Sequence, residues 1–138
     1  MAERPTEVPD APLSLAGAAL QRNAEGICLI GSICLRCGIN VFPPSPVCPR
    51  CQSEDMAAAE MPRRGRIYAF STVHAGPKQW IKPYTLAYVD LPNDVRVLAH
   101  LRGGEPSLGA EVMLGAGIVG ATPDGQAIET YVFDVESH

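Results

Sequence analysis

The amino-acid sequence predicts a mostly β protein, in which a short N-terminal helix and a small metal-binding ribbon precede a five-stranded barrel. Two Cys-x-x-Cys pairs, Cys34/Cys37 and Cys48/Cys51, are separated by ten residues. After them, the chain contains five segments of strand-like composition, divided by Gly, Pro, Asn and Asp, with no helical pattern of any length. We therefore expect three parts: an arm and short helix at 1–26, the four-cysteine ribbon at 27–60 and the barrel at 61–138.

The composition is that of a globular protein with an acidic surface. The chain has 138 residues, of which 46% are hydrophobic, enough for one domain or for a domain and a small module. Charged residues make up only 19%, a low share that is typical of a surface with a partner. The formal net charge is −4 and the isoelectric point is about 5.3. This balance argues against broad nucleic-acid binding, which needs a basic surface.

The N-terminal residues include Glu3, Glu7 and Asp10 and contain no apolar core, so we expect no signal peptide. No apolar run in the sequence approaches the length that spans a membrane. These features predict a cytoplasmic protein. Cysteines stay reduced in that compartment, which favours metal binding over disulfide formation.

The first 26 residues are predicted to form an arm, a helix and a turn. Residues 1–12 contain three prolines among polar residues and suit an extended arm. Residues 13–22 suit a short helix, because small or apolar side chains recur at helical spacing at Leu13, Ala16, Gly17 and Leu20. Such a short helix needs tertiary or intersubunit packing to be stable. Residues 23–26 suit a turn.

A strand at residues 27–33 is expected to lead into the first cysteine pair. Cys28 lies in this apolar segment and is interpreted as a small buried hydrophobic residue, not as a fifth ligand. Between the pairs, Ile39, Val41 and Phe42 supply a small apolar face. Residues 52–63, which are polar and rich in alanine, are interpreted as a connector.

The four cysteines are the strongest functional signal in the sequence. Each pair can direct two thiolates to one ion, and two pairs complete a tetrahedral four-sulfur shell. Gly38 follows the first pair, where the turn needs a residue that tolerates positive φ, and Gln52 holds the equivalent position after the second. A closed shell leaves no position for substrate, so the metal is expected to be structural. Zinc is preferred, with four-thiolate iron, two disulfides or four free thiols as alternatives.

The second half of the chain predicts a small Greek-key barrel of the OB type. The expected strands are 66–74, 84–91, 95–102, 111–119 and 128–135. Two of them alternate clearly and are expected to point one face inward, with Val95, Val97, Ala99 and Leu101 in one strand and Val112, Leu114, Ala116 and Ile118 in the other. Hairpins are expected at Leu91–Asp94 and at Asp124-Gly125.

In this order, the modules resemble the family called domain of unknown function 35, over about residues 13–133. The motifs that carry the resemblance are Cys34-Leu-Arg-Cys37-Gly38, Phe42-Pro43-Pro44, Cys48-Pro49-Arg50-Cys51, Gly65-Arg66-Ile67-Tyr68 and Pro83-Tyr84. The resemblance implies a rubredoxin-like zinc ribbon joined to an OB-fold barrel.

The same resemblance implies a function. Members of this family are typically small, non-catalytic partners of thiolase-fold enzymes that act on acyl-CoA by thiolysis, aldol cleavage or acyl transfer, in the degradation of aromatic, steroid or similar acyl-CoA compounds. The chain is then expected to be an accessory subunit, paired with a thiolase-fold subunit in a two-plus-two heterotetramer. The acyl-CoA thioester would be its ligand, with no nucleic acid and no membrane as partner.

The sequence contains no catalytic set of its own. It has no Gly-x-Ser-x-Gly elbow and no phosphate-binding Gly-Lys-Ser/Thr loop, and its carboxylates are scattered. His100 lies in an alternating strand and is interpreted as a solvent-facing or interface residue, whereas His74 ends a strand beside a loop that can meet a ligand. We therefore expect a subunit of a thiolase-like acyl-CoA acyltransferase complex that is not catalytic alone.

A basic and aromatic set is the candidate for binding coenzyme A or the partner. Its members are Arg63, Arg64 and Arg66 before the first barrel strand, and Lys78, Trp80, Lys82 and Tyr84 in and after the next loop. In a closed barrel the two segments can lie near each other, so that the cations meet phosphates and Trp80 stacks on adenine or packs against a partner. The alternative is a solvated rim, with Trp80 filling the gap between ribbon and barrel.

Two further functions stay open from the residues alone. Zinc ribbons and OB barrels are common in nucleic-acid-binding modules, whose strands carry stacking aromatic residues. Four thiolates also hold iron, which would make the ribbon an electron-transfer centre.

Overall fold

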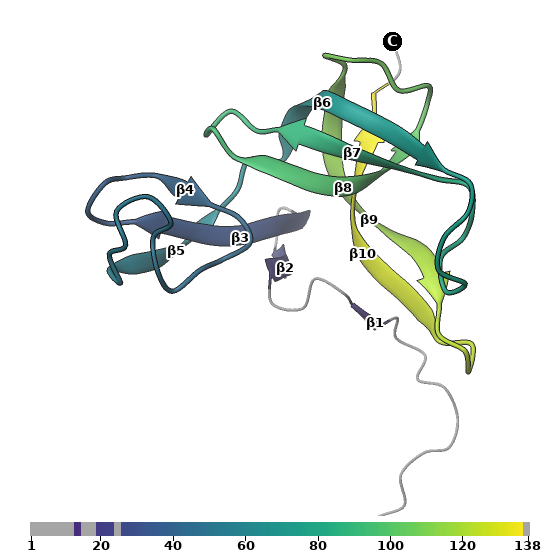
Figure 1. Cartoon of the computed structure of the whole chain (residues 1–138), viewed down its shortest axis with the longest axis horizontal. Helices are drawn as coiled ribbons and strands as arrows, with labels where there is room; N and C mark the ends of the chain where they lie inside the picture. Colours follow the sequence, from purple (N-terminus) through teal and green to yellow (C-terminus); the bar gives the residue numbers. More distant parts are fainter. Residues whose placement is uncertain (1–12, 15–18, 24–25, 137–138) are drawn as a thin grey trace, which may run out of the picture.

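The structure is a computed structural model that describes residues 13–14, 19–23 and 26–136. These residues form two β-sheets and their connections (Figure 1). The strands are β1 Leu13–Ser14, β2 Leu20–Asn23, β3 Gly26–Cys34, β4 Asn40–Val41, β5 Met56–Glu60, β6 Arg64–Val73, β7 Tyr84–Asp90, β8 Arg96–Gly103, β9 Glu111–Ala121 and β10 Ala127–Val135. In this part of the chain no helix has the length and apolar character needed to cross a membrane.

The helix predicted at residues 13–22 is wrong wherever the structure describes this segment. Leu13–Ser14 pairs with β10 as a short parallel strand, and Leu20–Asn23 pairs with the first half of β3. The predicted helical face consisted of small residues and offered little apolar area, so sheet hydrogen bonds satisfy this backbone instead. Residues 15–18 of that helix, and the arm predicted at 1–12, lie outside the described residues.

The ribbon is built on β3, whose second half pairs with both β4 and β5. The strand predicted at residues 27–33 is therefore confirmed, and Cys28 on it is buried, with 2% of its surface exposed. The connector predicted at residues 52–63 is wrong in part, because Met56–Glu60 forms β5. Alanine has a low strand propensity, and the pairing with β3 outweighs it.

The barrel is a closed ring of five strands in the order β6, β7, β8, β10, β9, with β9 returning to β6. β10 closes it by pairing parallel to β8 and antiparallel to β9. This arrangement confirms the five predicted strands and the OB-fold. The limits at 26/27 and 60/61 between the three expected parts stay a prediction.

The inward alternation predicted at residues 95–101 is confirmed, since Val95, Val97 and Ala99 are at most 5% exposed and Leu101 is partly buried against the core. The prediction for β9 is correct at Val112 and Leu114 but wrong at Ile118, which is 47% exposed, whereas Val119 is buried. The distal halves of β9 and β10 extend beyond the ring as a hairpin (Figure 1). Beyond the ring, the face of β9 that carries Val112 and Leu114 is exposed at Ile118. The opposite face is covered at Val119.

The ribbon and the barrel share one apolar core. Leu29 of β3 and Met61, both at most 1% exposed, belong to the same buried cluster as Val89 and Phe133 of the barrel. Beside this cluster, the ring of Phe42 packs edge-on against Tyr131, with ring centroids 5.8 Å apart. Burial of this shared apolar surface fixes the ribbon against the barrel.

The covered side of the distal hairpin is occupied by the loop at residues 74–83, which connects β6 to β7. Trp80 forms a β-bridge to Gly120, and the N–H of Ala121 donates to the carbonyl of Gln79 at 2.8 Å. A Cβ atom at Gly120 would lie 1.9 Å from that carbonyl oxygen. The backbone contact therefore requires glycine at this position.

We predict that Gly120→Ala separates the 74–83 loop from β9. Because the new methyl group cannot be accommodated, the free energy of unfolding should fall by about 1–3 kcal/mol, the usual cost of overpacking. The chain has a single tryptophan, Trp80, so fluorescence emission shifted to longer wavelength reports its exposure. Gly104→Ala, where a Cβ would have no atom within 4 Å, is the matched control. Unchanged emission and stability in Gly120→Ala would contradict the role of this contact.

Candidate metal centre and ligand groove

Two turns of the same design hold the cysteine pairs. The N–H of Gly38 donates to the carbonyl of Cys34, and the N–H of Gln52 donates to the carbonyl of Cys48, both at 2.9 Å. Gly38 has φ +83° and Gln52 has φ +63°, so both turns need the positive φ expected from the sequence. A side chain is uncommon in this conformation, and the second turn is therefore the more strained of the two.

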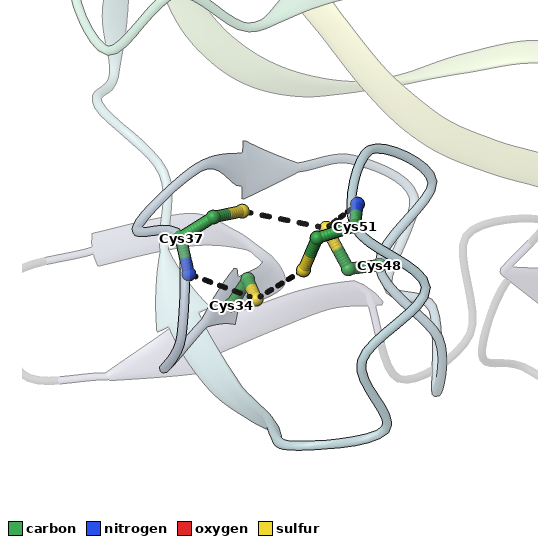
Figure 2. Close-up of side chains that lie close together, drawn as sticks. All are labelled: Cys34, Cys37, Cys48 and Cys51. Carbon is green, nitrogen blue, oxygen red and sulfur yellow. Dashed lines mark hydrogen bonds between the residues drawn. The ribbon is translucent and has the colours of Figure 1, made fainter.

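The four cysteine sulfurs converge on one point between the turns. They all lie within 4.8 Å of one another, and the Sγ atoms of Cys34 and Cys51, like those of Cys37 and Cys48, are 3.6 Å apart (Figure 2). A tetrahedral zinc ion with Zn–S bonds of about 2.3 Å places its sulfurs about 3.8 Å apart. A disulfide needs about 2.05 Å. The spacing fits one zinc ion and does not fit two disulfides.

The electrostatics of the cluster also fit a cation. The backbone N–H of Cys37 donates to the Cys34 sulfur at 3.4 Å and lowers the pKa of that thiol to about 6. In the second turn, the N–H of Cys51 donates to the Cys48 sulfur and lowers the pKa of Cys48. Two thiols are thus arranged to ionise, whereas burial and the three neighbouring sulfurs raise the pKa of Cys51 to about 11. A bound cation would offset this repulsion among thiolates.

The three arginines of the predicted binding set lie at the start of β6, and each has a carboxylate partner. Arg63 pairs with Glu60 at 3.6 Å, and Arg64 pairs with Glu136. Arg66 donates to Glu111 and to the carbonyl of Gly109, both at 3.0 Å. These guanidinium groups are engaged within the chain.

The other members of the set lie at the opposite end of the β6–β7 hairpin. In the register of this hairpin Arg66 is opposite Asp90, whereas Val73 is opposite Tyr84, so β6 separates the two groups by roughly 20–25 Å. The proximity expected from a closed barrel is therefore wrong. The Nζ of Lys82 donates to the carbonyls of Pro77 and Trp80 at 2.7 and 3.1 Å. These hydrogen bonds stabilise the 74–83 loop. Whether these residues bind a ligand stays a prediction.

Trp80 packs on the distal hairpin and not between ribbon and barrel. Its neighbours are the buried Val119, Ile128 and Val132. Next to it, His100 is half-buried, with ring centroids 5.2 Å from Tyr84 and 6.3 Å from Trp80. Burial lowers the pKa of His100 and favours the neutral imidazole. His74 is exposed at the end of β6.

A groove of about 750 Å³ opens beside Trp80, between the 74–83 loop and the turn that joins β9 to β10. Its lining residues are Lys78, Gln79, Trp80, Ile81, Ala121, Thr122, Pro123 and Ile128. The β9–β10 turn is held by the Thr122 hydroxyl, which accepts the N–H of Gln126 at 3.0 Å and donates to Asp124. The groove is mostly apolar, and Lys78 is the charged residue among those that line it.

Sequence reasoning found Lys78 and Trp80 but missed the opposite wall of the groove. Thr122 and Pro123 carried no signal of their own, because a turn between two strands is common. The predicted OB-fold could have indicated this wall. In an OB barrel, the loop between the first two strands and the loop between the last two belong to the ligand-binding surface.

Two family models match the chain, one for each module. The model described as "ChsH2, rubredoxin-like zinc ribbon domain" matches residues 29–57, and the one described as "ChsH2, C-terminal OB-fold domain" matches residues 58–117. Together they span the cysteine cluster and most of the barrel.

Three similar proteins match more than half of the chain. The benzoylsuccinyl-CoA thiolase subunit BbsA of Thauera aromatica is 36% identical over 107 residues, which are 76% of this chain and 74% of that protein. The subunit of the same name from Geobacter metallireducens is also 36% identical over 107 residues, 76% of this chain and 73% of that protein. A DUF35 domain-containing scaffold protein of Methanocaldococcus jannaschii is 32% identical over 85 residues, 59% of this chain and 60% of that protein.

A solved structure has a similar fold. A chain of the "Ltp2-ChsH2(DUF35) aldolase" superposes with a TM-score of 0.63 and 28% identity, over 78% of this chain and 84% of that one. The family models, the relatives and the fold agree with the cysteine and barrel motifs, and the chain therefore belongs to the DUF35 family, in which a rubredoxin-like zinc ribbon is joined to an OB-fold.

Proposed function

We propose that this chain is a non-catalytic accessory subunit of a thiolase-fold enzyme and supports the binding or turnover of its acyl-CoA substrate. The observation that carries the proposal is the similarity to two thiolase subunits across both the ribbon and the barrel. The chain would then contribute binding surfaces, and the partner would contribute the catalytic residues. The reaction would be thiolysis, aldol cleavage or acyl transfer, supplied by the partner.

In this proposal the four cysteines hold a structural zinc ion. Four protein sulfurs complete its coordination, so no position remains for water or substrate. The ion would fix the two turns of the ribbon, and Leu29 and Met61 would transmit that rigidity to the barrel through the shared core. The three parts expected at 1–26, 27–60 and 61–138 would act as one cytoplasmic subunit, in a heterotetramer of two such chains and two thiolase-fold subunits.

The groove beside Trp80 is the proposed contact with the acyl-CoA. Its apolar walls suit a flat or hydrophobic group, and its size is in the range of small-molecule sites. Lys78 would meet a phosphate at the margin, while Lys82 maintains the loop from which Trp80 and Lys78 project. Arg63, Arg64 and Arg66 would instead border the other end of β6, where their carboxylate partners leave little charge for phosphates.

The first prediction concerns the partner. The chain alone should turn over no acyl-CoA, while co-expression with the thiolase-fold subunit encoded in the same genome should give a stable complex that does. Size-exclusion chromatography with light scattering would measure the two-plus-two stoichiometry, and release of free coenzyme A would measure activity. Full activity of the thiolase-fold subunit without this chain would refute the proposal.

The second prediction concerns the metal. Purified protein should be colourless and contain one zinc per chain by elemental analysis, whereas four-sulfur ferric iron would be red. Cys37→Ser should lose the zinc, become less soluble and fail to assemble, because the ribbon depends on the metal for its structure. Cys28→Ala, which changes a buried thiol outside the cluster, should keep its zinc. A Cys37→Ser complex that is soluble and fully assembled but inactive would indicate that the metal takes part in the reaction.

The third prediction concerns the groove. In the assembled enzyme, Lys78→Glu should raise KM for the acyl-CoA roughly tenfold with little change in kcat, the size expected for losing one hydrogen bond to a charged group. Arg36→Glu makes the same change of charge at an exposed position on the zinc ribbon and should leave KM unchanged. Equal effects of the two variants would assign the loss to long-range charge and not to the groove.

A further inference from the structure

The outer face of β6, β7 and β8 exposes several aromatic and aliphatic side chains. On β7 the side chains of Ala87 and Val89 point into the barrel and are buried, so Tyr88 between them points outward. Tyr88 is directly opposite Leu98 of β8 in the strand register, and Tyr68 lies on the same side of β6. Tyr68, Tyr88 and Leu98 are 54%, 46% and 47% exposed. We refer to these three side chains as the outer apolar face.

The charges that border this face are neutralised within the chain. Arg96 donates two hydrogen bonds to Asp90, at 2.6 and 3.1 Å, and its guanidinium lies 3.4 Å above the ring of Tyr68. Arg66 beside it pairs with Glu111. The face therefore offers no unpaired cation for a phosphate backbone, and its electrostatic complement is an uncharged apolar protein surface.

A recess in the face can receive a side chain. It has a volume of about 270 Å³, and its walls are largely apolar, formed by Ala69, Phe70, Ser71, Leu86, Ala87, Tyr88 and Leu98. Tyrosine and arginine around an apolar recess are the composition of binding hot spots, which pair with anchor residues of the partner. The sheet ladder holds the recess in place, so little order is lost on binding.

The outer apolar face continues into the ligand groove. Leu86, next to Tyr88 on the same side of β7, is opposite His100, whose ring lies 5.2 Å from that of Tyr84. His100 also meets Trp80, which forms a wall of the groove. A protein that covers the outer apolar face therefore borders the groove. This continuity matters because an acyl-CoA held in the groove must reach the active site of a second subunit.

We propose that the outer apolar face is the surface on which the thiolase-fold subunit docks, with an apolar anchor residue of that subunit in the recess. The inference rests on the proposed function, since it takes its partner from there. It adds the location of the contact and a consequence: the groove beside Trp80 lies at the subunit boundary, where one substrate can touch both chains.

The test compares binding of the co-purified thiolase-fold subunit to wild type and to the Tyr88→Ser/Leu98→Ser double variant. The double variant should bind at least about 30-fold more weakly, the effect of losing a hot spot. Leu35→Ser, at a 60% exposed leucine of the zinc ribbon, is the control and should bind as wild type. Equal zinc content and equal melting temperature would show that all three proteins are folded.

Each other result has a defined meaning. Wild type that binds no thiolase-fold subunit refutes the proposed function, and this inference with it. Wild type and the double variant binding equally, or Leu35→Ser losing as much affinity as the double variant, refutes the docking face alone. Sedimentation of the isolated chain and titration with single-stranded oligonucleotides complete the test: a dimer or an oligonucleotide complex that the double variant loses, while it keeps the thiolase-fold subunit, also refutes the docking face.

Discussion

The double pairing of β10 is the constraint on which the barrel depends. This strand runs parallel to β8 and antiparallel to β9, and without either contact the ring would open and expose the core around Phe133, which is fully buried. Arg102 of β8 joins all three strands, since its guanidinium donates to both oxygens of Asp134 on β10 and to the carbonyl of Ala116 on β9. The space for this side chain comes from Gly117, where a Cβ would lie 2.7 Å from the guanidinium.

Closure of the ring also determines where the groove and the open sheet face lie. β9 and β10 are longer than the ring requires, so their distal halves project as a hairpin, and the 74–83 loop lies along its edge (Figure 1). The groove forms between these two segments. At the other side, Leu29 and Phe42 of the ribbon and the adjoining Met61 cover the barrel, which leaves the outer side of β6–β8 as an open sheet face. The metal cluster and the groove are therefore separate, and this separation is consistent with a structural role for the metal.

The cysteine cluster could be predicted almost completely from the sequence, whereas the positions of the proposed binding residues relative to one another could be predicted only in part. Spacing alone indicated which thiols converge and where positive φ occurs, at Gly38 and Gln52, because each turn is formed within five consecutive residues. Arg66 and Lys78 are near each other in the sequence, but an extended strand carries them to opposite ends of a hairpin. Thr122 and Pro123, which complete the groove, come from a part of the chain that no local pattern connects with Trp80.

Features that depend on neighbouring residues could be predicted from the sequence, and features that depend on contacts between distant segments could not. Alternation of apolar residues, Cys-x-x-Cys spacing and turn residues are local signals, and they were sufficient for the five barrel strands, the ribbon, the four converging sulfurs and the family. Contacts between distant segments decided the rest: Leu13–Ser14 became a strand because β10 offers an edge, and Met56–Glu60 because β3 does. Trp80 lies on the hairpin because Gly120 has no side chain, which allows the backbone of the 74–83 loop to pair with β9. A backbone hydrogen bond to a remote strand outweighs a weak local propensity, and no short window of sequence contains that strand.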